Sequence, residues 1–411
     1  MNLKKASLVI AGALVAFAAD VYACSSAVIS GKITPDGRPL LWKQRDTGAE
    51  QNSVKYYKGG KHSFIGIVNS KAKNPTEVWM GTNDAGFSIM NTQSYNLVPP
   101  KGDEDMGPAN GNVMRRALEI CSSVADFKHF LDTLARPTMI SANFGVIDAH
   151  GEGGYFEVGH ETYKYFDVND PSVAPCGYIA RTNYSFSGKV HEGMGYVRFI
   201  TENAELMRVA GTGEITPQWI FKTLARSYKN GMLGIDLRDG RFNKPHTTGW
   251  FLDKDFIARE MTASSCVVQG VKKGEKVELT TMWTVLGFPP ASVAVPLWVK
   301  DGDKLPVQVV NDSKTHLSPL CERVVKLKKS VFSYDQGGGT SMYFNWEKLH
   351  NPQGTGIMQV LEPVEDQIFE MSAPVIEKWR KKGEVDAKEM QALYGQIDAF
   401  IVEKYKELFD M

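Results

Sequence analysis

The chain has 411 residues, of which 43% are hydrophobic and 23% charged, an ordinary composition for a globular protein. Its 47 basic residues balance its 47 acidic residues, so the composition favours neither nucleic acid nor an anionic membrane as a partner. A chain of this length can bury a large core, as one large domain or two medium ones, and we expect its partner to be a small molecule.

The first 23 residues have the three-part layout of a secretory signal peptide. The basic start MNLKK precedes the apolar run ASLVIAGALVAFAA, which is too short to span a bilayer. The tripeptide VYA then places Val21 and Ala23 around a cleavage site. Cleavage after Ala23 would give a mature chain that begins at Cys24 and is secreted or periplasmic in a bacterium. No later segment of the sequence is apolar for long enough to form a membrane helix, so we expect no stable membrane insertion.

After Cys24 the chain alternates groups of predicted strands with predicted helices. The first two strands, SSAVISGK and PLLWK, flank the turn TPDGR, whose Asp-Gly pair favours a hairpin. Hydrophobic periodicity then predicts strands at 62–68, 77–82, 87–93, 141–149, 153–159, 164–168, 178–183, 265–271, 276–287 and 292–299, and helices at 112–124, 125–136, 194–210, 217–228, 363–379 and 386–408.

This order predicts an α+β architecture with mostly antiparallel sheets. We see no internal repeat and no convincing domain boundary. We therefore expect a single domain over residues 24–411, with C-terminal helices from about residue 363. The last helix is amphipathic and packs on a sheet or on another subunit, so a homo-oligomer is possible.

The five cysteines are scattered and form no CxxC pair, so the sequence suggests neither a zinc site nor a disulfide framework. We expect mostly free, buried thiols. His316 and His350 have no partner at a metal-ligand spacing, and the glycine-rich stretch DQGGGTS lacks the ending of a phosphate-binding loop. We predict no metal and no cofactor.

A cysteine at a new N-terminus lies beside its own α-amino group. That amine has an ordinary pKa of about 7.7–8.0, so it can take the thiol proton near neutral pH and return it to a leaving amine. Cys24 would then supply both nucleophile and base, without a catalytic histidine. Two other readings stay open: Cys24 carries a lipid anchor, which the bulky Tyr22 argues against, or it is a core thiol behind a different cleavage site.

The pattern C-S-S-x4-G-K-x-T-x-D-G-x5-K-x2-D, from Cys24 to Asp46, resembles the start of the cysteine N-terminal-nucleophile (Ntn) hydrolases that act on linear amides. This superfamily includes choloylglycine hydrolases, penicillin V acylases and isopenicillin N acyltransferases. The resemblance implies a four-layer αββα sandwich with two mostly antiparallel sheets. It spans roughly residues 24–298, and the last hundred residues match nothing informative.

In this family an Arg-x-x-Asp pair on the second strand faces the nucleophile, and the matching pair here is Lys43 and Asp46. The resemblance implies that Asp46 holds the α-amine and that the cation lies beside the thiol. Lysine replaces the usual arginine, and Arg45 is a second candidate because strand alternation puts it on the same face as Lys43. Alternation sends Asp46 to the other face, so the strand must end or bulge before it.

Two later segments resemble the parts of the family that supply amide groups near the reacting carbonyl. GTNDAGFSIMNTQSYN implies Asn91 on the oxyanion side, although strict spacing would select Gln93. IARTNYSFSG implies Asn183 near the carbonyl. SANFGVIDAHGEGGYFEVG resembles the central hairpin, in which we interpret Asp148 and Glu157 as structural.

The predicted activity is hydrolysis of a linear carbon–nitrogen amide through an acyl thioester on Cys24. N-acyl amino acids, bile salts, penicillins and short peptides all remain open as substrates. Ser265 stands where choloylglycine hydrolases have an arginine, which weakens a bile-salt assignment, and the segment around it looks more like the acyltransferase-like branch. The alternatives are a secernin-like cysteine dipeptidase, an acyltransferase or, outside enzymes, a lipid-anchored binding protein.

Overall fold

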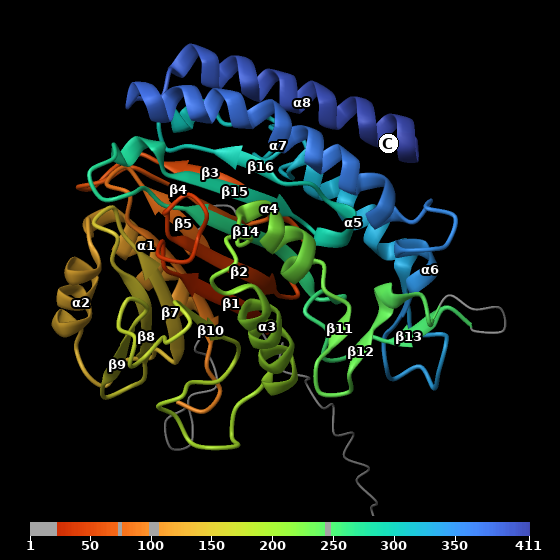
Figure 1. Ribbon diagram of the computed structural model, residues 1–411, viewed down its shortest axis with the longest axis horizontal. Coiled ribbons are helices and arrows are strands. Elements are labelled where there is room, and N and C mark those ends of the chain that lie inside the picture. Colours follow the sequence, from red (N-terminus) through yellow and green to blue (C-terminus); the bar gives the residue numbers. More distant parts are fainter. Residues whose placement is uncertain (1–22, 73–75, 98–106, 243–247) are drawn as a thin grey trace, which may run out of the picture.

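The computed structural model describes residues 23–72, 76–97, 107–242 and 248–411 (Figure 1). The signal peptide predicted over residues 1–23 lies outside the described residues, apart from Ala23. Ala23 is buried beside the first strand.

One of the two large sheets has six antiparallel strands, and the first of them along the chain carries Cys24. Its strand order is β10–β1–β2–β14–β15–β16. The strands are β1 (Cys24–Ile29), β2 (Leu40–Asp46), β10 (Tyr178–Arg181), β14 (Thr262–Gln269), β15 (Thr281–Leu286) and β16 (Val295–Leu297). The turn between β1 and β2 contains Gly37 at a φ of 72°, a left-handed conformation that glycine adopts without strain. The hairpin predicted from the Asp-Gly pair is confirmed.

The second large sheet is a meander of seven antiparallel strands that follow one another in chain order. These are β3 (Asn52–Tyr57), β4 (Phe64–Asn69), β5 (Met80–Asn83), β6 (Ser88–Gln93), β7 (Ala142–Ile147), β8 (Gly153–Val158) and β9 (Tyr163–Asp167). Two small sheets lie beside the main body: β11 (Lys229–Asn230) with β12 (Ile235–Asp236), and β13 (Trp250–Leu252) with β18 (Tyr343–Asn345) and β17 (Phe332–Ser333).

The two large sheets pack face to face, with β1 and β2 against β6 and β7, and helices cover both outer faces (Figure 1). On the seven-stranded side these are α1 (Gly107–Ile120) and α2 (Val124–Thr133). The other side carries α3 (Tyr196–Val209), α4 (Pro217–Trp219) with a π-helical continuation at Ile220–Ala225, α5 (Pro319–Val331), α6 (Trp346–Leu349), α7 (Ile357–Lys382) and α8 (Ala387–Phe409). The predicted αββα sandwich is confirmed.

Strand alternation along the meander builds two separate cores, which explains the layering. Ile89 and Phe156 pack with α1 and α2, whereas Met90 and Tyr155, one position away, pack with β1 and β2. Gly145 leaves room for Met90 of the neighbouring strand and for the facing sheet, because a Cβ atom there would lie 2.3 Å from Cε of Met90 and 3.2 Å from side-chain atoms of Leu41 and Val28.

The C-terminal helices match the predicted pair, with one difference at the start. Helix α7 begins at Ile357, so Pro363 lies inside it rather than in its first turn. The side chain of Gln359 accepts the N–H of Gly356 and thereby caps the earlier start, a signal that precedes the proline. Among the helices in the described part of the chain, none has the length and apolar composition needed to cross a bilayer.

Candidate active site

Cys24 is the first residue of β1 and its side chain lies on the face between the two sheets. It pairs with Arg45 on β2, and Ser26 pairs with Lys43. The hydroxyl of Ser26 is 2.9 Å from the hydroxyl of Tyr155 on the opposite sheet, which identifies the inner face of β1. Cys24 is two positions away and shares that face. It is 5% exposed.

The backbone nitrogen of Cys24 donates a hydrogen bond to Oδ1 of Asn183 at 2.7 Å. Because residue 23 is still attached, this nitrogen belongs to a peptide bond and stands in for the α-amino group that cleavage would expose. Asn183 follows β10, and its Nδ2 donates to the carbonyl of Gln93 at 2.9 Å. The Asn183 amide is therefore held at both ends, with its oxygen towards Cys24.

Lys43 places a buried amine near the thiol. Its Nζ donates to Oδ1 of Asn91 at 2.7 Å and to the carbonyl of Trp79 at 2.8 Å. Burial lowers the pKa of Lys43 to about 8, and the nearby Cys24 acts in the opposite direction. Since Oδ1 of Asn91 is turned towards Lys43, its Nδ2 is the donor end of that amide. Lys43 and Asn91 are thus in contact, on strands that pack against or pair with the strand of Cys24.

Arg45 and Gln93, the two alternatives that the sequence left open, make other side-chain contacts. Arg45 shares the face of Lys43, as alternation predicts, but donates to Oδ1 of Asn52 at 2.7 Å and stacks 4.6 Å from the centre of the Trp79 ring. Gln93 accepts a hydrogen bond from Asn110 of α1 at 2.7 Å. The choice of Lys43 over Arg45 and of Asn91 over Gln93 stays a prediction.

Asp46 lies on the other face of β2, as alternation predicts. Its carboxylate accepts from Nε of Arg259 at 2.8 Å and from the hydroxyl of Thr262 at 2.7 Å. The prediction that this strand ends or bulges before Asp46 is wrong, because β2 continues through Asp46, which pairs with Thr262. The register shift of this strand pair lies on β14, between Thr262 and Ser264. The oxygen that accepts the Cys24 N–H is that of Asn183, so a direct hold of Asp46 on the α-amine stays a prediction.

Two arginines near Cys24 were missed by the sequence analysis. Arg198 of α3 donates to the carbonyl of Cys24 and to Oδ1 of Asn183. Arg259, just before β14, forms an ion pair with Asp46 at 2.7 Å. Lys43 lies on the same face of the strands as the thiol, whereas Arg198 and Arg259 bind the Cys24 carbonyl and the Asp46 carboxylate. A cation on the face of the thiol would stabilise negative charge that develops on a substrate oxygen.

The residues interpreted as structural make structural contacts. Asp148 accepts the N–H of Val124 at the start of α2, at 2.9 Å. Glu157 forms a buried ion pair with Arg181 at 2.7 Å. Ser265, in place of the choloylglycine-hydrolase arginine, accepts the indole N–H of Trp42 at 3.0 Å.

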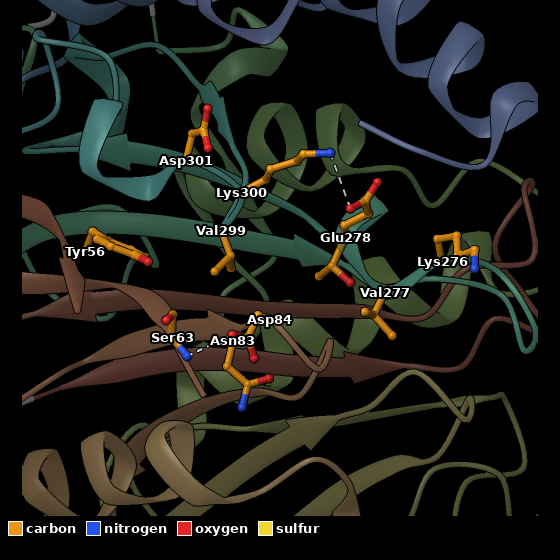
Figure 2. A pocket seen from close by; sticks show the side chains of 11 residues that line it. Tyr56, Ser63, Asn83, Asp84, Lys276, Val277, Glu278, Val299, Lys300 and Asp301 are labelled. Atoms are coloured by element: carbon orange, nitrogen blue, oxygen red, sulfur yellow. Dashed lines mark hydrogen bonds and ion pairs between the residues drawn. The ribbon is translucent and has the colours of Figure 1, made fainter. Parts of the chain in front are cut away.

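A separate cavity of about 360 Å³ lies between the turn after β5 and the segments that flank β15 and β16 (Figure 2). Its wall includes the ion pair of Lys300 with Glu278 at 3.5 Å. None of the predicted site residues lines it. Across the described ranges of the chain, no three His, Cys, Asp or Glu side chains gather as a metal site would require.

Residues 35–229, just under half of the chain, match the family model described as acyl-coenzyme A:6-aminopenicillanic acid acyl-transferase. No curated protein matches the sequence. The match agrees with the resemblance to acyltransferase-like proteins that the sequence analysis gives.

Similar solved structures include a mutant conjugated bile acid hydrolase from Clostridium perfringens, with 12% identity and a TM-score of 0.38 over 67% of this chain and 92% of that chain. A Caenorhabditis elegans orthologue of N-acylethanolamine-hydrolyzing acid amidase has 12% identity and a TM-score of 0.39, over 59% and 92%. Penicillin V acylase from Agrobacterium tumefaciens has 9% identity and a TM-score of 0.37, over 68% and 86%. At these TM-scores the likeness does not extend to substrates or to site residues.

Proposed function

We propose that the protein is a secreted or periplasmic amidohydrolase that cleaves a linear carbon–nitrogen amide through an acyl thioester on Cys24. The observation that carries the proposal is the position of the Cys24 nitrogen, 2.7 Å from Asn183 Oδ1, at the start of a strand whose inner face also carries the buried Lys43 amine on the neighbouring strand. Removal of residues 1–23 would turn this nitrogen into an amine that is already oriented beside its own thiol.

In the proposed reaction the α-amine takes the thiol proton and sulfur attacks the amide carbonyl carbon. The carbonyl electron pair moves to oxygen, and the Asn91 amide and Lys43 ammonium would stabilise the resulting oxyanion. The carbon–nitrogen bond then breaks as the leaving nitrogen takes the proton from the α-ammonium. Water attacks the thioester, its proton passes through the amine to sulfur, and the acid leaves.

Acyl transfer is the second candidate, and the description of the matching family favours it. It differs only in the last step, where an amine replaces water as the acceptor of the acyl group. A secernin-like dipeptidase would use the same nucleophile on a free N-terminal dipeptide. The alternative of a lipid-anchored binding protein is incompatible with all three activities, because acylation of the α-amine would remove its basicity.

The first experiment is the intact mass and N-terminal residue of protein exported by a bacterial host. A free Cys24 start supports the proposal, whereas a start elsewhere or a mass that carries acyl chains contradicts it. The exported protein is then incubated with N-acyl amino acids, conjugated bile acids, penicillin V and dipeptides, with and without an added amine.

Cys24→Ser is the matched variant for this panel. It should fold and be exported but lose most turnover, because the hydroxyl is a much weaker nucleophile than the thiol at neutral pH. Full turnover by Cys24→Ser would contradict the mechanism. Cleavage of dipeptides alone would replace amidase by dipeptidase, and formation of a new amide with the added amine would identify the acyltransferase.

A further inference from the structure

Arg198 reaches from helix α3 to the backbone of the strand that carries the nucleophile. Its Nη1 donates to the carbonyl of Cys24 at 2.5 Å and to the hydroxyl of Ser25 at 3.1 Å, and its Nη2 donates to Oδ1 of Asn183 at 2.8 Å. The residue is 2% exposed. Hydrogen bonds to three neutral oxygens therefore replace the water around this buried guanidinium. The oxygens belong to the first two residues of β1 and to Asn183, which binds the Cys24 nitrogen.

These bonds close a ring around Cys24. The nitrogen of Cys24 donates to Asn183 Oδ1, Arg198 donates to the same oxygen, and Arg198 also donates to the carbonyl of Cys24. Both polar ends of the Cys24 backbone are therefore tied to one rigid unit. This hold becomes more important after cleavage, because the bond from Asp46 N–H to the carbonyl of Ala23, 2.9 Å in this chain, is then lost.

A glycine before the first residue of α3 leaves space for the guanidinium of Arg198. Gly195 precedes the helix with a φ of 83°, a left-handed conformation that other residues adopt only with strain. A Cβ atom at this position would lie 2.5 Å from Nη2 of Arg198. Glycine is required here both for the turn and for the path of the Arg198 side chain.

The charged and titratable groups that face Arg198 are Arg259, Asp46, Cys24 and Glu202. Burial lowers the pKa of Arg198 to about 10, so the guanidinium stays protonated at neutral pH. Asp46 is bound to Arg259. Burial raises the pKa of Glu202, one turn further along α3, well above its ordinary value, which favours the neutral acid. The positive charge of Arg198 is therefore not cancelled by a hydrogen-bonded carboxylate.

We infer that Arg198 is a positioning residue that fixes the carbonyl of Cys24 and the amide of Asn183, so that the N-terminal amine keeps its orientation beside the thiol. The inference rests on the proposed function and adds a residue to it. Arg198 donates hydrogen bonds to the Cys24 carbonyl, the Ser25 hydroxyl and the Asn183 amide oxygen. It acts through Asn183 and through the Cys24 backbone.

The test compares Arg198→Met and Arg198→Lys with Arg208→Met in the processed protein, using the best substrate from the panel above. Arg208 lies on the same helix but is exposed and pairs with Glu205, so it controls for the loss of a charge from α3. We measure kcat, KM, the pH profile of kcat/KM and the thermal midpoint.

For Arg198→Met we expect kcat to fall about 100-fold, the size of effect that a misplaced catalytic group produces, with KM changed less than about threefold. The acidic limb of the kcat/KM profile should move to higher pH, because loss of a nearby cation favours the ammonium form of the amine. Arg198→Lys should recover part of kcat, since lysine keeps the charge but cannot bind all three oxygens. If Arg198→Met does not fold, the comparison of Arg198→Lys with Arg208→Met tests the inference instead.

A kcat for Arg198→Met equal to that of Arg208→Met would overturn the inference, as would a loss no larger than the unfolded fraction explains. An inactive wild-type enzyme, or activity that survives in Cys24→Ser, would instead refute the proposed function. The two failures are therefore distinguishable.

Discussion

Lys43 offers the sharpest test of the active-site electrostatics, through the substitution Lys43→Met. Burial lowers the pKa of Lys43 from 10.5 to about 8. At Lys43 the unfolded state therefore binds more protons than the folded state between about pH 8 and pH 10.5, so the contribution of this residue to the free energy of unfolding should rise with pH across that window. Methionine does not titrate, and the variant should lack this rise.

The size of the effect follows from the shift. A shift of roughly 2.5 units corresponds to about 3 kcal/mol, of which about 2.5 kcal/mol would be gained between pH 7 and pH 10. The sign of the stability change at pH 7 alone is not diagnostic, because methionine also leaves Asn91 Oδ1 and the Trp79 carbonyl without their donor, at a cost of about 1–3 kcal/mol each. The slope against pH separates the two effects.

Urea unfolding followed by tryptophan fluorescence at intervals from pH 7 to pH 10 measures this slope. Lys329→Met, at an exposed position on α5, is the control. Turnover of Lys43→Met should fall by about 100-fold or more as a donor to the oxyanion is lost. Parallel stability curves for the wild type and Lys43→Met would refute the reasoning, because they would mean that Lys43 has the same pKa in the folded and unfolded chains.

Three further substitutions test other contacts of the site. Asn183→Ala should lower turnover about 100-fold or more while lowering the free energy of unfolding by only about 1–3 kcal/mol; equal losses in activity and in folded fraction would make Asn183 a structural residue. Arg259→Met should destabilise the protein by about 3–5 kcal/mol in urea unfolding at pH 7, because it leaves the buried Asp46 carboxylate without its cation, and a loss below about 1 kcal/mol would contradict that view. Glu202→Gln should gain stability relative to the wild type as the pH rises above about 4.3, since a raised pKa in the folded state means that wild-type stability is lost with rising pH; urea unfolding at pH 4.5 and pH 8 should show this, and the reverse trend would speak against a buried neutral acid.

Local chemistry explains why much of the fold could be predicted. The Asp36-Gly37 turn fixes the first hairpin, and alternation correctly put Arg45 beside Lys43 and sent Asp46 to the other face. The break or bulge expected in the strand before Asp46 is absent, because β2 is continuous through that residue, and the bulge is instead on the strand paired with it. It lies on β14, at Ala263, which only the register with the neighbouring strand reveals.

The arginines of the site could not be predicted for a related reason. Arg198 and Glu202 are four residues apart on a helix, a spacing typical of an exposed ion pair, and nothing local indicates that both are buried. Their burial arises because α3 packs on β1. Arg259 lies in a short loop before β14, and its contact with Asp46 joins residues 213 positions apart. Long-range packing, not local pattern, assembles this part of the site.

The partners of the buried cations near Cys24 indicate what these charges contribute to the site. Arg259 is paired with a carboxylate, whereas Lys43 and Arg198 make their hydrogen bonds to neutral oxygens. Buried cations bound only to neutral groups cost stability, and a site that served packing alone would gain by replacing them with apolar side chains. An anion near Lys43 would offset that cost, and the proposed mechanism forms one on the carbonyl oxygen. Lys43 would then bind the transition state more tightly than the resting enzyme, which is the condition for catalysis, whereas Arg198 would act through the Cys24 backbone and Asn183.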